Sequence, residues 1–281
     1  MRSGLVLLLV LATSLAVCAQ QLASFDSKMS AALSGMKSAN LTAKEKAFDE
    51  VMALISEEQH QAPIMGQADA FATFFTRHPD QAEPLKLGLI ELLRSANGLF
   101  VSGKNAAPGI YTEDDTEHYA RIVDAVSSLD DERAIPALVG AMTTGGMAQR
   151  GLVKYGDKAL GPVLEQLKNP DALVRASALG LSVTLLERSN DPKSRERAVE
   201  IIRQGLADSA SVVRGHAVRE IDCLDQRQEF VPILKRIAIT DPEKILGKAS
   251  DGGDGDGFYP VRYDARQVLR DIQTNTMCKP Q

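Results

Sequence analysis

The chain has 281 residues and a formal net charge of −5 at pH 7, from 32 basic and 37 acidic side chains. A general nucleic-acid binder needs a basic face, and this mildly acidic composition argues against one. Tryptophan is absent and aromatic residues make up only 5% of the chain. We therefore expect closely stacked helices with small and aliphatic side chains, in one extended array or two modest domains, and no binding of nucleic acid.

Residues 1–19 have the pattern of a secretory signal peptide. Arg2 is followed by an apolar run and then by a cleavage site of small residues that ends at Ala19. Cys18 lies in a sequence similar to a bacterial lipid-attachment motif, but Val17 stands where that motif has Gly, Ala or Ser, so lipid anchoring is not expected. The pattern predicts export to a periplasm or to the outside of a bacterial cell, with no transmembrane segment after the signal is removed.

Beyond the leader the apolar residues recur every three or four positions, which predicts an all-α protein. We expect a helical region at 20–96, a loop at 97–111 where three glycines and a proline gather, a second helical region at 112–275 and a tail at 276–281. Two apolar stripes should be buried. They are Leu85, Leu89, Leu92 and Leu93 in one helix and Tyr119, Ile122, Val123, Val126 and Leu129 in another.

Four short segments in the second half are variants of one another. Each has an arginine after a mostly apolar stretch, followed by small or apolar residues at helical spacing. The segments are 148–153, 173–178, 212–217 and 260–265. Repetition at intervals of a few tens of residues indicates an α-solenoid of stacked helix pairs. The spacing is irregular, with insertions at 188–195 and 246–258.

Two longer stretches carry a resemblance to a known family. Asp131–Leu138 (DERAIPAL) and Asn169–Gly180 (NPDALVRASALG) resemble the HEAT-repeat superfamily, in particular the short HEAT-like repeats of the phycobilisome-lyase type. The match covers about residues 113–275. The resemblance implies right-handed stacking of antiparallel helix pairs, with a concave face lined by the second helix of each pair. It does not imply bilin chemistry, since such repeats occur in many proteins that have no catalytic role.

The repeated arginines have two possible roles. They could form a basic stripe that recognises carboxylates or phosphates, or a structural ladder in which each guanidinium binds aspartates or carbonyls of a neighbouring repeat. Arginine's planar fork suits the second role, which we favour. The residues of this predicted ladder are Arg150, Arg175, Arg214, Arg262, Asp171 and Asp208.

The segment 251–257 is rich in glycine and aspartate. Asp251, Asp254 and Asp256 could hold calcium weakly, but the segment lacks the first aspartate and the bidentate glutamate of an EF-hand loop. A flexible acidic insertion fits the composition better. No other cofactor is expected.

Two cysteines remain after the leader. In an exported protein Cys223 and Cys278 could form a disulfide that ties the tail to the preceding repeat; the alternative is a buried Cys223 and a free tail thiol.

No catalytic or metal motif is present, and the four histidines are scattered. We therefore expect a non-catalytic, exported scaffold or adaptor that binds a protein partner on helices near 147–155, 171–187, 209–222 and 260–273. A calcium- or ligand-responsive module that uses loop 251–257 is the first alternative. An enzyme with an unrecognised site is the second.

Overall fold

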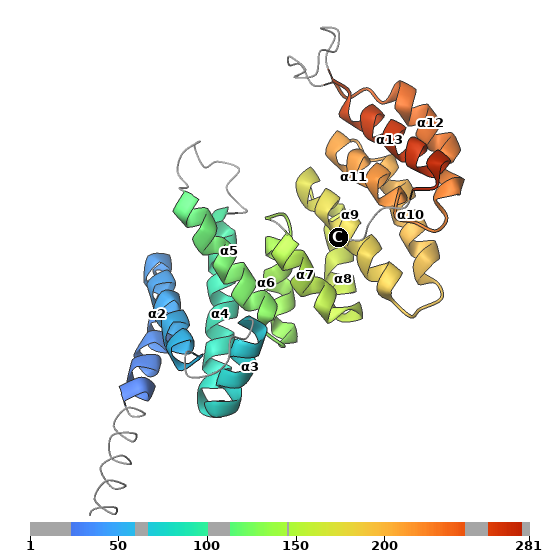
Figure 1. The fold of residues 1–281 in the computed structure, drawn as a ribbon. Coiled ribbons are helices and arrows are strands. Elements are labelled where there is room, and N and C mark those ends of the chain that lie inside the picture. The colour runs from blue at the N-terminus through green and yellow to red at the C-terminus, as the bar shows by residue number, and fades with distance from the viewer. Residues whose placement is uncertain (1–23, 60–66, 101–112, 145, 245–257, 277–281) are drawn as a thin grey trace, which may run out of the picture. The chain divides into compact units, whose positions relative to one another are not determined.

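The computed structural model describes residues 24–59, 67–100, 113–144, 146–244 and 258–276 (Figure 1). Within these ranges every regular element is a helix and no β-strand occurs, so the all-α prediction is confirmed. None of the described helices combines the length and the apolar composition that crossing a membrane requires.

The chain divides into two compact units, residues 1–141 and 142–281. In the first unit residues 24–35 are helical. The elements that follow are α2 (Leu41–Gln59), α3 (Gln67–Arg77), α4 (Pro79–Phe100), α5 (Glu113–Ser128), the short 3₁₀ helix η1 (Glu132–Ala134) and α6 (Ile135–Ala141).

Helix α4 is the central element of the first unit, because it contacts α2, α3, α5 and α6. Both predicted apolar stripes are confirmed as core. Leu85, Leu89, Leu92 and Leu93 of α4 and Tyr119, Ile122, Val123, Val126 and Leu129 in and after α5 are all buried. The helices on either side of the predicted loop at 97–111 therefore pack against each other within one unit.

Helix α4 is longer than its composition predicts. Residues 97–100, which we expected to begin a loop, form its last turn. Asn97 explains the extension, because its Nδ2 donates to the Ala137 carbonyl at 2.8 Å and its Oδ1 accepts from the Tyr119 hydroxyl at 2.6 Å. These bonds anchor the end of α4 to α5 and α6 despite Gly98, a residue that lowers helix propensity.

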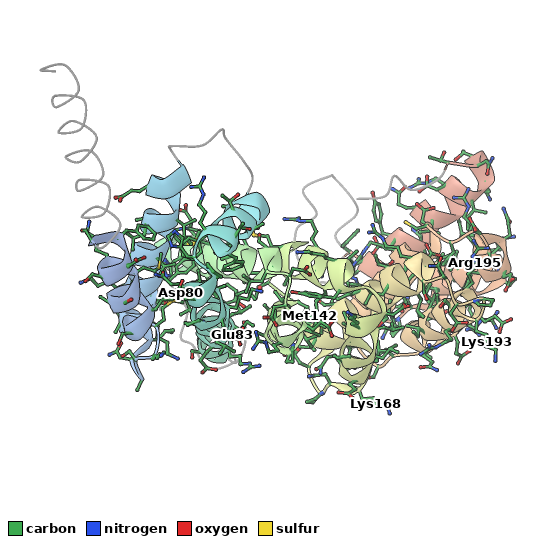
Figure 2. The ribbon with its side chains drawn as sticks, turned by 90° about the horizontal axis from the view of Figure 1, so that it is seen from below. Asp80, Glu83, Met142, Lys168, Lys193 and Arg195 are labelled. Carbon is green, nitrogen blue, oxygen red and sulfur yellow. The ribbon has the colours of Figure 1, made fainter. Side chains whose placement is uncertain are left out.

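Arg133 joins the start of α6 to α4. Its Nη1 and Nη2 donate to the two carboxylate oxygens of Glu83 at 2.5 and 2.9 Å, and its Nε donates to Asp131 at 2.8 Å. Asp131 also accepts from the Arg133 backbone N–H as the N-cap of η1. Glu83 lies in the first half of α4 (Figure 2). The predicted motif at 131–138 thus begins with a capped turn that is fixed to the central helix.

The second unit contains α7 (Gly146–Tyr155), α8 (Asp157–Glu165), η2 (Gln166–Lys168), α9 (Ala172–Arg188), α10 (Ser194–Leu206), α11 (Ser211–Ile221), η3 (Arg227–Phe230), α12 (Val231–Thr240) and α13 (Pro260–Thr274). Helix α9 packs against α8, α10 and α11, and α11 packs against α9, α10 and α13. Helix α12 packs against α13. In Figure 1, α11 accordingly lies between α9 and α13.

Close packing in this unit depends on Gly205 of α10. A β-carbon added there would lie 2.1 Å from Leu179 Cδ1 and 3.0 Å from Ala217 Cβ. Both distances are shorter than ordinary van der Waals contact. The missing side chain therefore lets α10 approach α9 and α11 at the same time.

Candidate functional site

Arg175, near the start of α9, uses its whole guanidinium group inside the second unit. Nε and Nη2 donate to the two carboxylate oxygens of Asp208 at 2.9 and 2.8 Å. Nη1 donates to the carbonyl oxygens of Asn169 and Pro170 at 2.9 and 3.1 Å. Because Asp208 follows α10, this charge-assisted bidentate pair fixes α9 to the α10–α11 connection.

Arg214, near the start of α11, repeats the arrangement with the next connection. Nε and Nη2 donate to Asp241 at 2.7 and 3.0 Å. Nη1 donates to the carbonyl oxygens of Asp208 and Ser209 at 3.0 and 2.9 Å. Arg175 of α9 and Arg214 of α11 thus bind the same set of groups, namely one aspartate carboxylate and two preceding backbone carbonyls.

Both aspartates are held in the charged form. The hydrogen bond from Arg175 lowers the pKa of Asp208 below its ordinary value, although burial acts in the opposite direction. Burial also raises the pKa of Asp241, but the hydrogen bonds from Arg214 and from the Glu243 backbone outweigh it and lower the pKa overall. At neutral pH these are therefore pairs of opposite charges.

Arg262, near the start of α13, binds differently. Its Nε donates to the Asp241 backbone carbonyl at 2.6 Å, and its guanidinium carbon lies 3.9 Å from the centre of the Tyr259 ring. A cation at this distance over an aromatic face is stabilised by the ring quadrupole. Arg262 thus contacts the same loop residue as Arg214, but through the backbone.

Arg150 is exposed on α7 and has no carboxylate partner among the described residues. The residue at the position equivalent to Asp208 and Asp241 gives the physical reason. Those two aspartates follow α10 and α12, whereas Asn169 follows α8 and η2. Its side chain is an amide, so it offers Arg150 no carboxylate.

Asp171 acts mainly on its own helix. Its carboxylate accepts from the Leu173 backbone N–H at 2.9 Å and caps α9. Its charge adds to the raised pKa of Arg175, for which the largest cause is the hydrogen bond to Asp208.

Cys223 is disulfide-bonded. Cys278, and with it the predicted pairing, lies outside the described residues, as do Cys18 and the predicted calcium ligands Asp251, Asp254 and Asp256.

Arg227 binds the end of the described chain. Its side chain is buried, Nη1 donates to the Thr276 carbonyl at 2.6 Å, and Nη2 donates to Asn275 Oδ1 at 3.2 Å. Nη1 also lies 3.4 Å from Asp222 Oδ1. The residues that follow α13 are therefore held beside the end of α11.

A group that sequence reasoning missed lies where α9 faces α11. His216 and Glu220 are four residues apart on α11, and Gly180 of α9 lies opposite them. A β-carbon at Gly180 would be 3.0 Å from Glu220 Oε1 and 3.9 Å from His216 Nδ1. Together with Glu187 at the end of α9, we call Gly180, His216 and Glu220 the Glu220 cluster.

Burial sets the protonation of this cluster. It raises the pKa of Glu220 to about 7; the charge of Arg219 opposes the shift and that of Glu187 adds to it. Burial also lowers the pKa of His216, and Arg219 lowers it further. Near neutral pH the cluster therefore holds a carboxyl that is partly protonated beside an imidazole that is mostly uncharged.

Two ion pairs border the cluster. Arg219 of α11 donates to Asp264 of α13 at 2.6 Å. Arg195, at the start of α10 (Figure 2), lies 3.7 Å from Asp225. Glu187 is exposed but has lost part of its hydration, which raises its pKa; the charge of Asp225 raises it further, and Arg195 opposes the shift.

Chemically, a carboxyl with a pKa of about 7 can hold or release a proton near neutral pH, and perturbed pKa values of this kind cluster at functional sites. Among the described residues no group of three or more histidine, cysteine, aspartate or glutamate side chains has an arrangement that could hold a metal ion. The sequence signal for the cluster was Gly180, the one glycine in α9.

No protein-family model, no curated protein and no solved structure matches this chain.

Proposed function

We propose that this chain is an exported HEAT-like α-solenoid that binds a protein partner and catalyses no reaction. The binding surface is formed by α9, α11 and α13, with α7 as a further contributor. Export is supported by the leader pattern at 1–19, and the repeat assignment by the resemblance of about residues 113–275.

One observation carries the proposal. The guanidinium groups of Arg175 and Arg214 are bound by aspartates and carbonyls within the second unit. This arrangement supports a structural role for the repeated arginines, because few of their donors are left for an outside ligand. Helices α9 and α11, and α11 and α13, pack directly against each other, as second helices of successive pairs do in a solenoid.

The partner test uses the full chain as bait against the exported protein fraction. Glu187 is exposed at the edge of the proposed surface on α9, and Glu200 is exposed on α10. We expect a specific partner to be retained by the parent and by Glu200→Lys and to be lost with Glu187→Lys. Repeated failure to recover any partner, or equal loss with both variants, contradicts the proposal.

Two alternative functions have their own tests. Calorimetric titration with calcium, and its repetition with Asp254→Asn, tests the responsive-module alternative for loop 251–257. The enzyme alternative is favoured only by the pKa of Glu220, which lies in the range of general acid–base catalysts. A turnover that Glu220→Gln abolishes and Glu200→Gln preserves would establish it.

A further inference from the structure

The packing of Glu220 against α9 makes its charge state matter for the contact between two helices. Glu220 is half-buried, and Oε1 lies 3.0 Å from the position that a β-carbon on Gly180 would occupy. A larger residue at 180 would force the carboxyl to shift by a few tenths of an ångström or more. The α9–α11 contact is thus built around an acidic group and not around an apolar one.

No hydrogen bond from a described residue stabilises the charged form of Glu220. A buried carboxylate that lacks donors has lost hydration without compensation, whereas a protonated carboxyl is much less costly to bury. Because Glu220 is half-buried, the neutral form therefore fits the closed contact better than the ionised form does.

Helices α9, α10 and α13 pack against α11, and each carries charged groups near Glu220. From α9, Glu187 repels the ionised carboxylate. On α11 itself Arg219 attracts it, but Arg219 is bound to Asp264 of α13. From α10, Arg195 lowers the pKa of Glu187 and is not among the charges that shift the pKa of Glu220. The balance of neighbouring charges leaves burial as the dominant influence.

We propose that the α9–α11 contact at Gly180 is a proton-dependent switch: protonated Glu220 stays against α9, and ionised Glu220 turns to solvent and loosens the contact. Because α9 and α11 belong to the proposed binding surface, the switch makes that surface respond to pH. This consequence rests on the proposed function, whereas the switch itself is a property of the isolated chain.

The direct test is a carboxyl-carbon NMR titration of the isolated full chain. We expect the Glu220 resonance to titrate with a midpoint near 7. Glu187→Gln removes the repelling charge, so the midpoint should fall, whereas Glu200→Gln should leave it unchanged. A midpoint near the ordinary glutamate value of 4.5, or no response to Glu187→Gln, overturns the proposal.

The loosening is measured by hydrogen exchange of peptides from α9 and α11, corrected for the intrinsic pH dependence of exchange. We expect faster exchange at pH 8 than at pH 5.5 in the parent and no such difference in Glu220→Gln. His216→Gln should keep the difference. If the difference persists in Glu220→Gln, or disappears only in His216→Gln, the switch is not Glu220.

These measurements use no partner. A failed titration therefore removes the switch and leaves the binding proposal standing, and a failed partner search does the reverse.

Discussion

Arg214 and Asp241 are joined by two parallel hydrogen bonds of 2.7 and 3.0 Å, although they lie on different sides of α12 in the sequence. Asp241 is only 5% exposed. Burial removes most of the hydration of its carboxylate, so Asp241 depends on Arg214 for compensation. The same dependence holds, less completely, for Asp208 and Arg175.

Removal of the Arg214 side chain should therefore strongly destabilise the folded chain. We expect Arg214→Ala to lower the free energy of unfolding by about 3–5 kcal/mol, the usual effect of leaving one buried charge without its partner. Urea denaturation measures the change. The matched control is Arg203→Ala, because Arg203 and Glu229 are both 55% exposed and 3.4 Å apart. That exposed pair should contribute no more than about 1 kcal/mol; equal losses in the two variants would show that the Arg214 pair has no special role.

The stabilising effect of Asp208 should disappear in acid. Its pKa is lowered in the folded chain, so the native state favours the ionised form. The resulting stability is present above the ordinary aspartate pKa of 3.8 and is lost as the pH falls through the lowered value. The difference in unfolding free energy between the parent and Asp208→Asn should therefore shrink from pH 5 to pH 2.5. A constant difference over that range contradicts this account.

Glu220 should give a pH dependence of opposite sign. Because its pKa is raised from 4.5 to about 7, the folded state keeps the proton that the unfolded state loses. Its favourable contribution is complete below pH 4.5 and is lost as the pH rises through 7, with a maximum size of about 3 kcal/mol. The side chain in Glu220→Gln is neutral at every pH. The free energy of unfolding of this variant should therefore rise relative to that of the parent as the pH rises over this range. Thermal unfolding from pH 4.5 to 8 measures the gain, and parallel curves would refute the assignment.

Replacement of Gly205 by alanine should destabilise the second unit. In Gly205→Ala the new carbon meets Leu179 and Ala217, and we expect a loss of about 1–3 kcal/mol from overpacking. Gly161 of α8 has open space around the corresponding position. Gly161→Ala should be neutral or slightly stabilising, by up to about 1 kcal/mol, because alanine favours the helix. No loss of stability in Gly205→Ala, or an equal loss in Gly161→Ala, would contradict a packing role that is specific to Gly205.

Arg227 should hold the last turn of α13. Arg227→Met keeps much of the apolar stem but removes the donors to Thr276 and Asn275. We expect faster hydrogen exchange in residues 270–276 with little change in α12. Arg236→Met, at an exposed position of α12, is the control. Unchanged exchange at the end of α13 in Arg227→Met would show that the Arg227 bonds are not needed to hold this turn.

Much of the helical framework could be predicted from the sequence, because apolar spacing directly reflects which face is buried. Leu85, Leu89, Leu92 and Leu93 are fully buried, as their spacing predicts. The extension of α4 to Phe100 could not be foreseen in this way. It depends on bonds from Asn97 to Ala137 and Tyr119, which are distant in sequence.

The arginine contacts were predictable only where the sequence repeats regularly. Arg175 and Asp208 both belong to the predicted ladder, and they pair in the structure. Asp241 was missed because the insertion at 246–258 separates it from Arg262 and disrupts the spacing that relates Asp208 to Arg214. Glu220 was missed for another reason. Its environment is created by Gly180 on a different helix, and the pattern of α11 alone does not reveal it.

Asp208 and Asp241 each belong to two arginine contacts. Asp208 binds Arg175 through its carboxylate and Arg214 through its backbone carbonyl, and Asp241 binds Arg214 and Arg262 in the same two ways. Tension applied to one helix of this series is therefore passed to the next through a single residue. We expect α9, α11 and α13 to unfold together under a stretching force, and not one helix at a time.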